Sequence, residues 1–346
     1  MKRIVLSALA VAAIASCTKN EVIPETNELQ EITYQTIETK AATAFDTGKR
    51  FISYAWFLPK GQNWATNNST SSLYIPGTEI YFQTNRWKAA TSYYWPKQGS
   101  LTFFAWTNNT STPSLVDATV ACSNTQGITV NSYDITKNAN VDFLVADVAA
   151  DQRENTSSMG SWEKGVPTVF KHALSKLIFV VKTVKNGTEY NYNSDKVTFK
   201  VKSIKLSGVN NMMAYAQVAG SSTHSWTNPS PQVELNEVFA FSNTKTQATS
   251  TGVTLSPAAD DYYIVIPQSF DDDDILTINY EIITEFVTEK PVTENVTQSV
   301  KLSTIYTDGW KATQQHTLTI SLGIDEILWD PAQTDWTDGA DGSVSL

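Results

Sequence analysis

Residues 169–181 read VFKHALSKLIFVV and form the longest apolar stretch in the body of the chain. The spacing of the apolar residues over 173–177 would also suit a helix. However, the stretch ends in β-branched and aromatic residues, and an Asn186-Gly187 pair, which favours a tight turn, follows shortly after it. These two features predict a buried β-strand.

The next segment repeats the strand pattern with one irregularity. Val197, Phe199 and Val201 alternate with polar residues, which is the period of a half-buried strand. Ile204 and Leu206 continue the alternation after a shift of one residue. Such a phase change predicts a bulge or a bend in the strand.

The same alternation recurs in the rest of the chain. It is seen at Leu276, Ile278, Tyr280 and Ile282, at Val296, Val300 and Leu302, and at Leu318, Ile320 and Leu322. Apolar runs also occupy 51–58, 101–106 and 141–146, and no segment shows a long stripe at helical spacing. The sequence therefore predicts an all-β protein.

A polar, glycine-containing stretch at 151–164 separates two strand-rich blocks of similar size. We therefore predict an N-terminal domain at 41–167 and a C-terminal domain at 168–346. Each is expected to be an antiparallel β-sandwich with Greek-key connections, because short strands and frequent turns are typical of that architecture.

The first 17 residues predict an export signal. Lys2 and Arg3 precede an apolar run at 4–15, which is shorter than the roughly 20 residues that a membrane span needs. The run ends in Ile-Ala-Ser-Cys at 14–17, which is typical of a bacterial lipoprotein signal with acylation at Cys17. The alternative is an ordinary signal peptide in which Cys17 has no role. Residues 18–40 then supply a polar tether and a short strand-like segment at 31–37.

The sequence shows no constellation that supports catalysis. The net charge of −10 argues against a nucleic-acid partner, because such a partner requires a basic face. His172 and His316 lie in apolar or strand-like runs, where a structural hydrogen bond is the favoured role. The acidic run 271–274 could offer oxygen ligands to Ca²⁺ but lacks the pattern of an EF-hand loop, so a solvated turn is favoured. We predict no enzyme activity, no metal site and no cofactor.

Short motifs spread along the chain resemble the fimbrillin-like pilins of Bacteroidetes, also called type V pilins. These motifs are, in chain order, IASCTK at 14–19, TKA at 39–41, DFL at 142–144, FKHALSKL at 170–177, GWK at 309–311, HTLTI at 316–320 and DWTDG at 335–339. The resemblance implies two transthyretin-like β-sandwich domains, export as an outer-membrane lipoprotein and assembly with other fimbrial subunits at the cell surface, where fimbriae serve adhesion.

The resemblance also implies a route of assembly. In the family a trypsin-like protease removes an N-terminal strand after a basic residue, and a strand from the next subunit fills the groove that is left. Here Ile32 and Tyr34 lie on one face of the removable segment 31–37, although Ile37 breaks the alternation. Lys40 is the best-placed processing site, and Arg50 is the second candidate.

The donor strand implied by the resemblance is the C-terminal tail, from Trp336 to Leu346, in which Val344 and Leu346 are the apolar anchors. Two alternatives stay open. Lys40 and Arg50 could be plain surface charges on a subunit that is never cut, such as a tip or an anchor. The chain could also be a non-polymerising surface lipoprotein that binds host glycans or proteins through its tryptophans.

Overall fold

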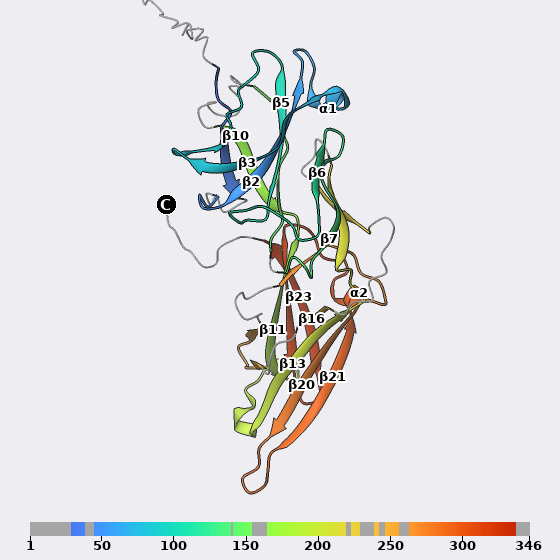
Figure 1. Ribbon diagram of the computed structural model, residues 1–346. Helices are drawn as coiled ribbons and strands as arrows, with labels where there is room; N and C mark the ends of the chain where they lie inside the picture. Colours follow the sequence, from blue (N-terminus) through green and yellow to red (C-terminus); the bar gives the residue numbers. More distant parts are fainter. Residues whose placement is uncertain are drawn as a thin grey trace, which may run out of the picture.

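The chain folds into two β-rich lobes that lie end to end (Figure 1). This computed structural model describes residues 29–38, 45–139, 141–153, 165–218, 223–228, 239–241, 246–255 and 263–336. In these ranges the helical elements are all about one turn long: α1 (Trp64–Asn67), α2 (Leu302–Ile305) and the 3₁₀ turns η1 (Asn68–Thr70) and η4 (Tyr192–Asp195). The predicted all-β class is confirmed.

The N-terminal lobe is built on an eight-stranded sheet whose pairings close into a ring. The strand order is β2-β3-β4-β1-β10-β8-β5-β9, and β2 also pairs with β5. The strands are β1 (Tyr34–Glu38), β2 (Arg50–Leu58), β3 (Ser72–Gln83), β4 (Arg86–Ala89), β5 (Ser100–Thr107), β8 (Leu144–Ala146), β9 (Ala149–Gln152) and β10 (Val166–His172). Because β1 lies between β4 and β10, it is the strand that closes this part of the ring.

A four-stranded sheet accompanies the ring in the same lobe, in the order β15-β14-β7-β6. Its strands are β6 (Val120–Ser123), β7 (Gly127–Asp134), β14 (Met212–Gln217) and β15 (His224–Thr227). The two sheets pack on a common core. One buried cluster contains Phe104 of β5, Tyr215 of β14 and Phe143, which directly precedes β8. Strands β14 and β15 come from the second half of the chain but complete a sheet of the first lobe.

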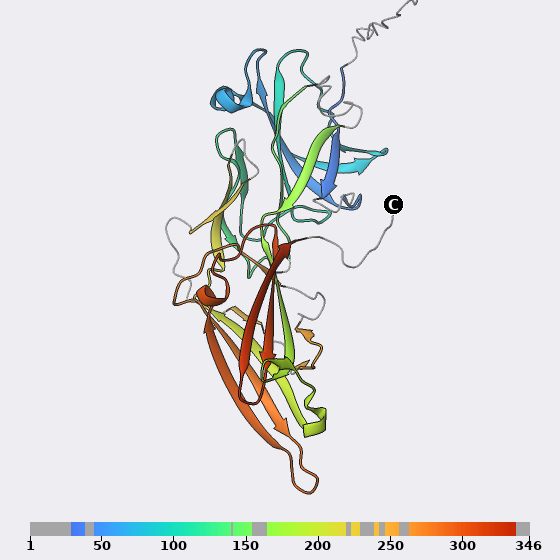
Figure 2. The same ribbon diagram turned by 180° about the vertical axis from the view of Figure 1, so that it is seen from behind.

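The C-terminal lobe is a sandwich of a six-stranded and a five-stranded sheet. The first sheet contains β11 (Ser175–Lys185), β12 (Thr188–Glu189), β18 (Val253–Leu255), β19 (Tyr263–Val265), β22 (Gln314–Leu322) and β23 (Ile327–Asp335). The second contains β13 (Val197–Ser207), β16 (Phe239–Phe241), β17 (Thr246–Gln247), β20 (Ile275–Thr284) and β21 (Val292–Lys301). The two sheets share one core, which contains Phe179 of β11, Phe199 of β13, Ile278 of β20 and Leu318 of β22. Figure 2 shows this lobe from behind, with the β20–β21 hairpin at its far end.

The expectation of purely antiparallel sheets is wrong in two places. Strand β1 pairs with β10 in parallel, and β11 pairs with β22 in parallel over eight residue pairs, from Lys176↔Gln315 to Thr183↔Leu322. Parallel neighbours cannot be joined by a hairpin, so each of these pairs joins segments that are far apart in the sequence. The transthyretin-like Greek-key arrangement stays a prediction.

The stretch at 169–181 forms two strands rather than one. β10 ends at His172, β11 begins at Ser175, and the two strands belong to different sheets. The chain therefore passes from one lobe to the other through Ala173 and Leu174, both fully buried. The predicted boundary between 167 and 168 falls inside β10, and the division into two independently folding domains stays a prediction.

The alternating segments form strands as expected, with one exception. Leu276, Ile278, Tyr280 and Ile282 are the buried positions of β20. In β13 the pairing register shifts between Val201 and Ser203, so the predicted bulge is present. Leu302, however, is not in a strand. It begins α2, directly after β21 ends at Lys301, and its side chain is buried.

Candidate assembly interface

The segment that the sequence singles out at 31–37 lies in the ring of the N-terminal lobe. β1 pairs with β10 over five residue pairs, from Tyr34↔Val166 to Glu38↔Phe170. On its other side it pairs with β4 at Tyr34↔Trp87. Without β1, the facing edges of β4 and β10 would be left unpaired, and an unpaired edge is a template for another strand.

The two anchor residues proposed for this segment point into the core. Ile32 is 3% exposed and Tyr34 is 4% exposed. The Tyr34 ring meets Phe51 of β2 and Phe103 of β5 edge to face, with centroid distances of 5.4 and 5.9 Å. Burial raises the pKa of the Tyr34 phenol well above its usual 10. Ile37 pairs with Val169 through its backbone, and its side chain lies outside the described ones.

Backbone hydrogen bonds hold the residues before β1 on both sides. The Ile32 amide donates to the Tyr93 carbonyl at 2.8 Å, and the Thr33 carbonyl accepts from the Val166 amide at 2.7 Å. The Glu31 carboxylate accepts a hydrogen bond from the Ser92 hydroxyl and lies 3.5 Å from the Lys88 ammonium. The segment is thus an integral part of the lobe and not a loose extension.

Gly165, directly before β10, allows the backbone there to approach the segment at 31–37 closely. Its φ of +91° is unfavourable for residues with a side chain. A Cβ atom at this position would lie 2.6 Å from the Thr33 carbonyl oxygen. The sequence analysis missed this role, because a glycine at the end of a polar stretch is read first as a loop residue.

Phe45 is a second residue that the sequence analysis missed. It is 1% exposed and packs on Trp87 and Phe170, with centroid distances of 5.2 and 5.1 Å. It belongs to the same buried cluster as Ile32 and Tyr34 but follows Lys40 in the chain. The core around β1 is therefore filled from both sides of the predicted cut.

Of the two candidate processing residues, the structure describes Arg50 and not Lys40. Lys40 and the lipidation residue Cys17 lie outside the described residues. Arg50 is the first residue of β2, where its amide donates to the Thr110 carbonyl at 2.9 Å. Its guanidinium lies 2.6 Å from the Glu79 carboxylate. A protease could reach the Arg50 peptide bond only after the start of β2 had detached.

The C-terminal tail, residues 337–346, follows Trp336, a buried residue held by several contacts. Trp336 is 4% exposed, and its amide donates to the Thr313 carbonyl at 2.8 Å. Its ring stacks face to face on His172, with centroids 3.8 Å apart, and His172 Nδ1 lies 2.6 Å from Asp142 Oδ2. Trp336 thus fastens the end of β23 to the end of β10. Val344 and Leu346 lie outside the described residues.

The other polar candidates have structural partners. His316 Nε2 accepts from the Lys311 amide, and His224 Nδ1 lies 2.8 Å from the Tyr215 hydroxyl. Within the acidic run, the carboxylates of Asp271 and Asp274 accept hydrogen bonds from backbone amides of the same turn. Across the described ranges, no three His, Cys, Asp or Glu side chains are grouped closely enough to hold a metal ion.

Comparison with known proteins gives the family. A family model described as fimbrillin-like matches residues 39–336. The chain belongs to the fimbrillin-like family. Membership of this family implies a cell-surface location and points to a structural role. No helix in the described part of this fimbrillin-like chain is long and apolar enough to cross a bilayer.

Solved structures share the fold of this fimbrillin-like chain. A fimbrial protein from Bacteroides vulgatus is 18% identical with a TM-score of 0.68, and the alignment covers 89% of this chain and 100% of that one. A putative cell adhesion protein from Bacteroides uniformis is 14% identical with a TM-score of 0.50, and the alignment covers 90% and 99%. No curated protein matches the chain. The family supports a fimbrial role for this chain, and the two solved structures show that its fold is shared.

Proposed function

We propose that this protein is a structural subunit of a cell-surface fimbria that assembles by strand exchange. One observation carries the proposal: β1 closes a ring of strands and contributes the buried Ile32 and Tyr34 to its core. Removing β1 would uncover apolar surface and two strand edges at once. Burial of each large apolar side chain stabilises by about 1.5–3 kcal/mol, so a replacement strand with similar anchors would bind well.

The proposed trigger is a trypsin-like cut after Lys40. Before the cut, β1 is tethered to its own groove, so its effective concentration there exceeds that of any strand from another molecule. After the cut, β1 can leave while Phe45 stays with the mature chain. We favour Lys40 over Arg50, because cleavage at Arg50 would require part of the β2 pairing to open.

The proposed donor is the tail beyond Trp336. Its ten residues, 337–346, could reach roughly 33–36 Å when extended. Val344 and Leu346 would take the place of Ile32 and Tyr34 in the groove of the next subunit. Trp336 would stay buried as the root of the tail. Before assembly the chain would be held at the outer membrane through lipidated Cys17.

The test is limited trypsin treatment of the purified uncleaved protein, followed by gel electrophoresis without boiling. The wild type should give a ladder of polymers, and Lys40→Ala should remain monomeric. Arg50→Ala is the matched control and should give the same ladder as the wild type. A ladder from Lys40→Ala together with none from Arg50→Ala would move the site to Arg50. No ladder from any protein would contradict assembly by strand exchange and favour a non-polymerising subunit.

A further inference from the structure

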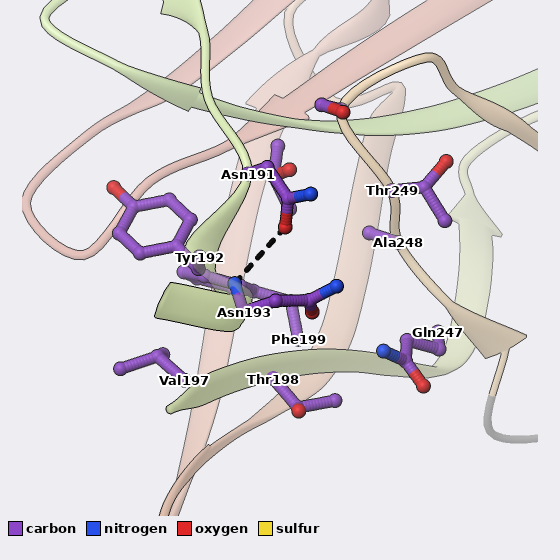
Figure 3. Close-up of a pocket in the computed structure, with 11 residues that line it drawn as sticks. Asn191, Tyr192, Asn193, Val197, Thr198, Phe199, Gln247, Ala248 and Thr249 are labelled. Carbon is purple, nitrogen blue, oxygen red and sulfur yellow. Dashed lines mark hydrogen bonds between the residues drawn. The ribbon is translucent and has the colours of Figure 1, made fainter. Parts of the chain in front are cut away.

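The C-terminal lobe contains a polar cavity of about 150 Å³. It lies where η4 and the start of β13 face the end of β17 (Thr246–Gln247) and the segment that follows it. Figure 3 shows Asn193 and Gln247 reaching into this opening from opposite walls, whereas the ring of Tyr192 turns away from it. In Figure 1 the region of η4 lies in the lower part of the C-terminal lobe, far from β1 and the ring.

No side chain that lines the cavity is charged. The polar residues of the lining include Asn191, Asn193, Thr198, Gln247 and Thr249. In the part of the chain that the structure describes, the side chains of Asn193, Gln247 and Thr198 form no hydrogen bond to other protein groups. Val197, Phe199 and Ala248 supply apolar surface at the base and are buried.

The walls are tied to both sheets of the sandwich, so the cavity is preformed. The Ala248 amide donates to the Phe199 carbonyl of β13 at 2.9 Å, and the Thr183 amide of β11 donates to the Thr249 carbonyl at 3.0 Å. On the opposite wall, Asn191 Oδ1 accepts from the Asn193 amide at 3.0 Å and caps η4. Because the backbone of the walls is already fixed, only side chains such as Asn193 and Gln247 would have to be ordered when a ligand binds.

We infer that this cavity binds one neutral sugar unit of a glycan. A cavity of about 150 Å³ is on the scale of one six-membered ring, since an engineered cavity of that size holds benzene, so a larger sugar unit would enter it in part and keep some of its substituents outside. Amide and hydroxyl groups can each donate to or accept from sugar hydroxyls, while the apolar base suits the C–H face of the ring. A phosphate or carboxylate ligand would find no cation, and an apolar ligand would leave the amides buried without partners.

This inference rests on the proposed function, a fimbrial subunit at the cell surface, but it concerns a different part of the molecule from assembly. The cavity belongs to η4, β13, the end of β17 and the residues after it, whereas strand exchange would take place at β4 and β10. A donor strand in the groove would therefore leave the cavity open. Each subunit of a fimbria would then present one weak sugar site, and many sites along the filament would add up to avid attachment.

The experiment measures binding of methyl glycosides to the uncleaved protein by saturation-transfer NMR. The panel contains the methyl glycosides of glucose, galactose, mannose, fucose and N-acetylglucosamine, with methyl glucuronide as the charged comparison. At least one neutral glycoside should bind with a Kd on the order of 1 mM, which is the expectation for so small a ligand. Thr198→Val and Gln247→Ala should each weaken that binding roughly tenfold, because each removes one hydrogen-bonding group.

The matched control is Gln298→Ala on the exposed strand β21 of the same lobe, which should bind like the wild type. The inference is overturned if no neutral glycoside binds, if methyl glucuronide binds most tightly, or if Thr198→Val and Gln247→Ala both bind like the wild type. The gel ladder after trypsin treatment is recorded on the same proteins. A normal ladder without sugar binding overturns the sugar site alone, and sugar binding without a ladder overturns strand exchange alone.

Discussion

Gly165 lies directly before β10, where the chain comes close to the segment leading into β1. The backbone from Val166 onward can pair with residues 33–38 only because no side chain at Gly165 stands between the two backbones. The position combines two demands, a positive φ and an absent Cβ. Gly61 and Gly187 have a positive φ but free space at the Cβ position, which allows the two demands to be separated by experiment.

We predict that Gly165→Ala destabilises the uncleaved protein more than alanine at a comparable glycine. Gly61 and Gly187 also have positive φ, of +89° and +72°, but a Cβ at either would meet no atom within 4 Å. Those controls should lose about 1 kcal/mol of unfolding free energy, and Gly165→Ala about 1–3 kcal/mol more, because Thr33 must move. Urea unfolding measures the difference. Equal losses at all three positions would show that β1 does not depend on this contact.

A second residue-scale prediction concerns the acid sensitivity of the fold. Burial lowers the pKa of His316 from 6.5 to about 4, because it desolvates the imidazolium form. The folded state therefore resists protonation, while the unfolded state takes up a proton below about pH 6.5. The contribution of the neutral His316 side chain to the free energy of unfolding is therefore complete above pH 6.5 and is lost as the pH falls towards 4.

His316→Gln should reduce the loss of unfolding free energy between pH 7 and pH 4 by about 3 kcal/mol relative to the wild type. The measurement is urea unfolding at both pH values. His224 has its pKa lowered to about 4 for the same main reason, so part of the acid sensitivity should remain in the variant. An unchanged pH dependence in His316→Gln would mean that His316 is not the residue that resists protonation.

At the scale of elements, we predict that residues 337–346 act in assembly alone, whereas Trp336 acts in stability. A chain that ends at Trp336 lacks the proposed donor but keeps the stack on His172 and the bond to Thr313. It should unfold like the full-length chain and give no ladder after trypsin treatment. Trp336→Ala should lose about 3–5 kcal/mol of unfolding free energy, because it empties a packed site where β23 meets β10. A ladder from the truncated chain would exclude residues 337–346 as the donor.

The elements that could be predicted are those whose signal is local. The alternation in β20 and β22 and the bulge in β13 follow from the period of the side chains along one strand. The same holds for Ile32 and Tyr34, whose spacing put them on one face before the structure showed them buried. Burial of one face is enough to set such a pattern, whichever strand lies beside it.

The elements that could not be predicted depend on distant partners. Nothing in residues 212–217 indicates that β14 would pair with β7, some eighty residues earlier, rather than with a strand of the C-terminal lobe. The parallel neighbours of β1 and β11 are equally remote. For the candidate site, the role of Gly165 depends on which backbone lies opposite, and the sugar cavity depends on three segments that meet only after folding.

At the scale of the whole molecule, we expect lipidation of Cys17 to hold the uncleaved chain at the membrane. We predict that Cys17→Ala removes the acyl chains and moves the protein from the membrane fraction to the soluble fraction. Each buried CH₂ of an acyl chain contributes about 0.8 kcal/mol, so several chains hold a protein firmly and their loss releases it. Mass spectrometry and fractionation measure both effects. Membrane association that survives the substitution would contradict anchoring through Cys17.

The direct passage from β10 to β11 has a mechanical consequence. In a filament, tension from the next subunit would enter through the strand bound beside β10 and would leave through the tail after β23. The covalent link from β10 to β11 is short, because only Ala173 and Leu174 lie between the two strands. The load would then cross the long parallel pairing of β11 with β22 and continue to β23. Eight residue pairs loaded along their length must break together, so most of each lobe would bear no force while the filament is stretched.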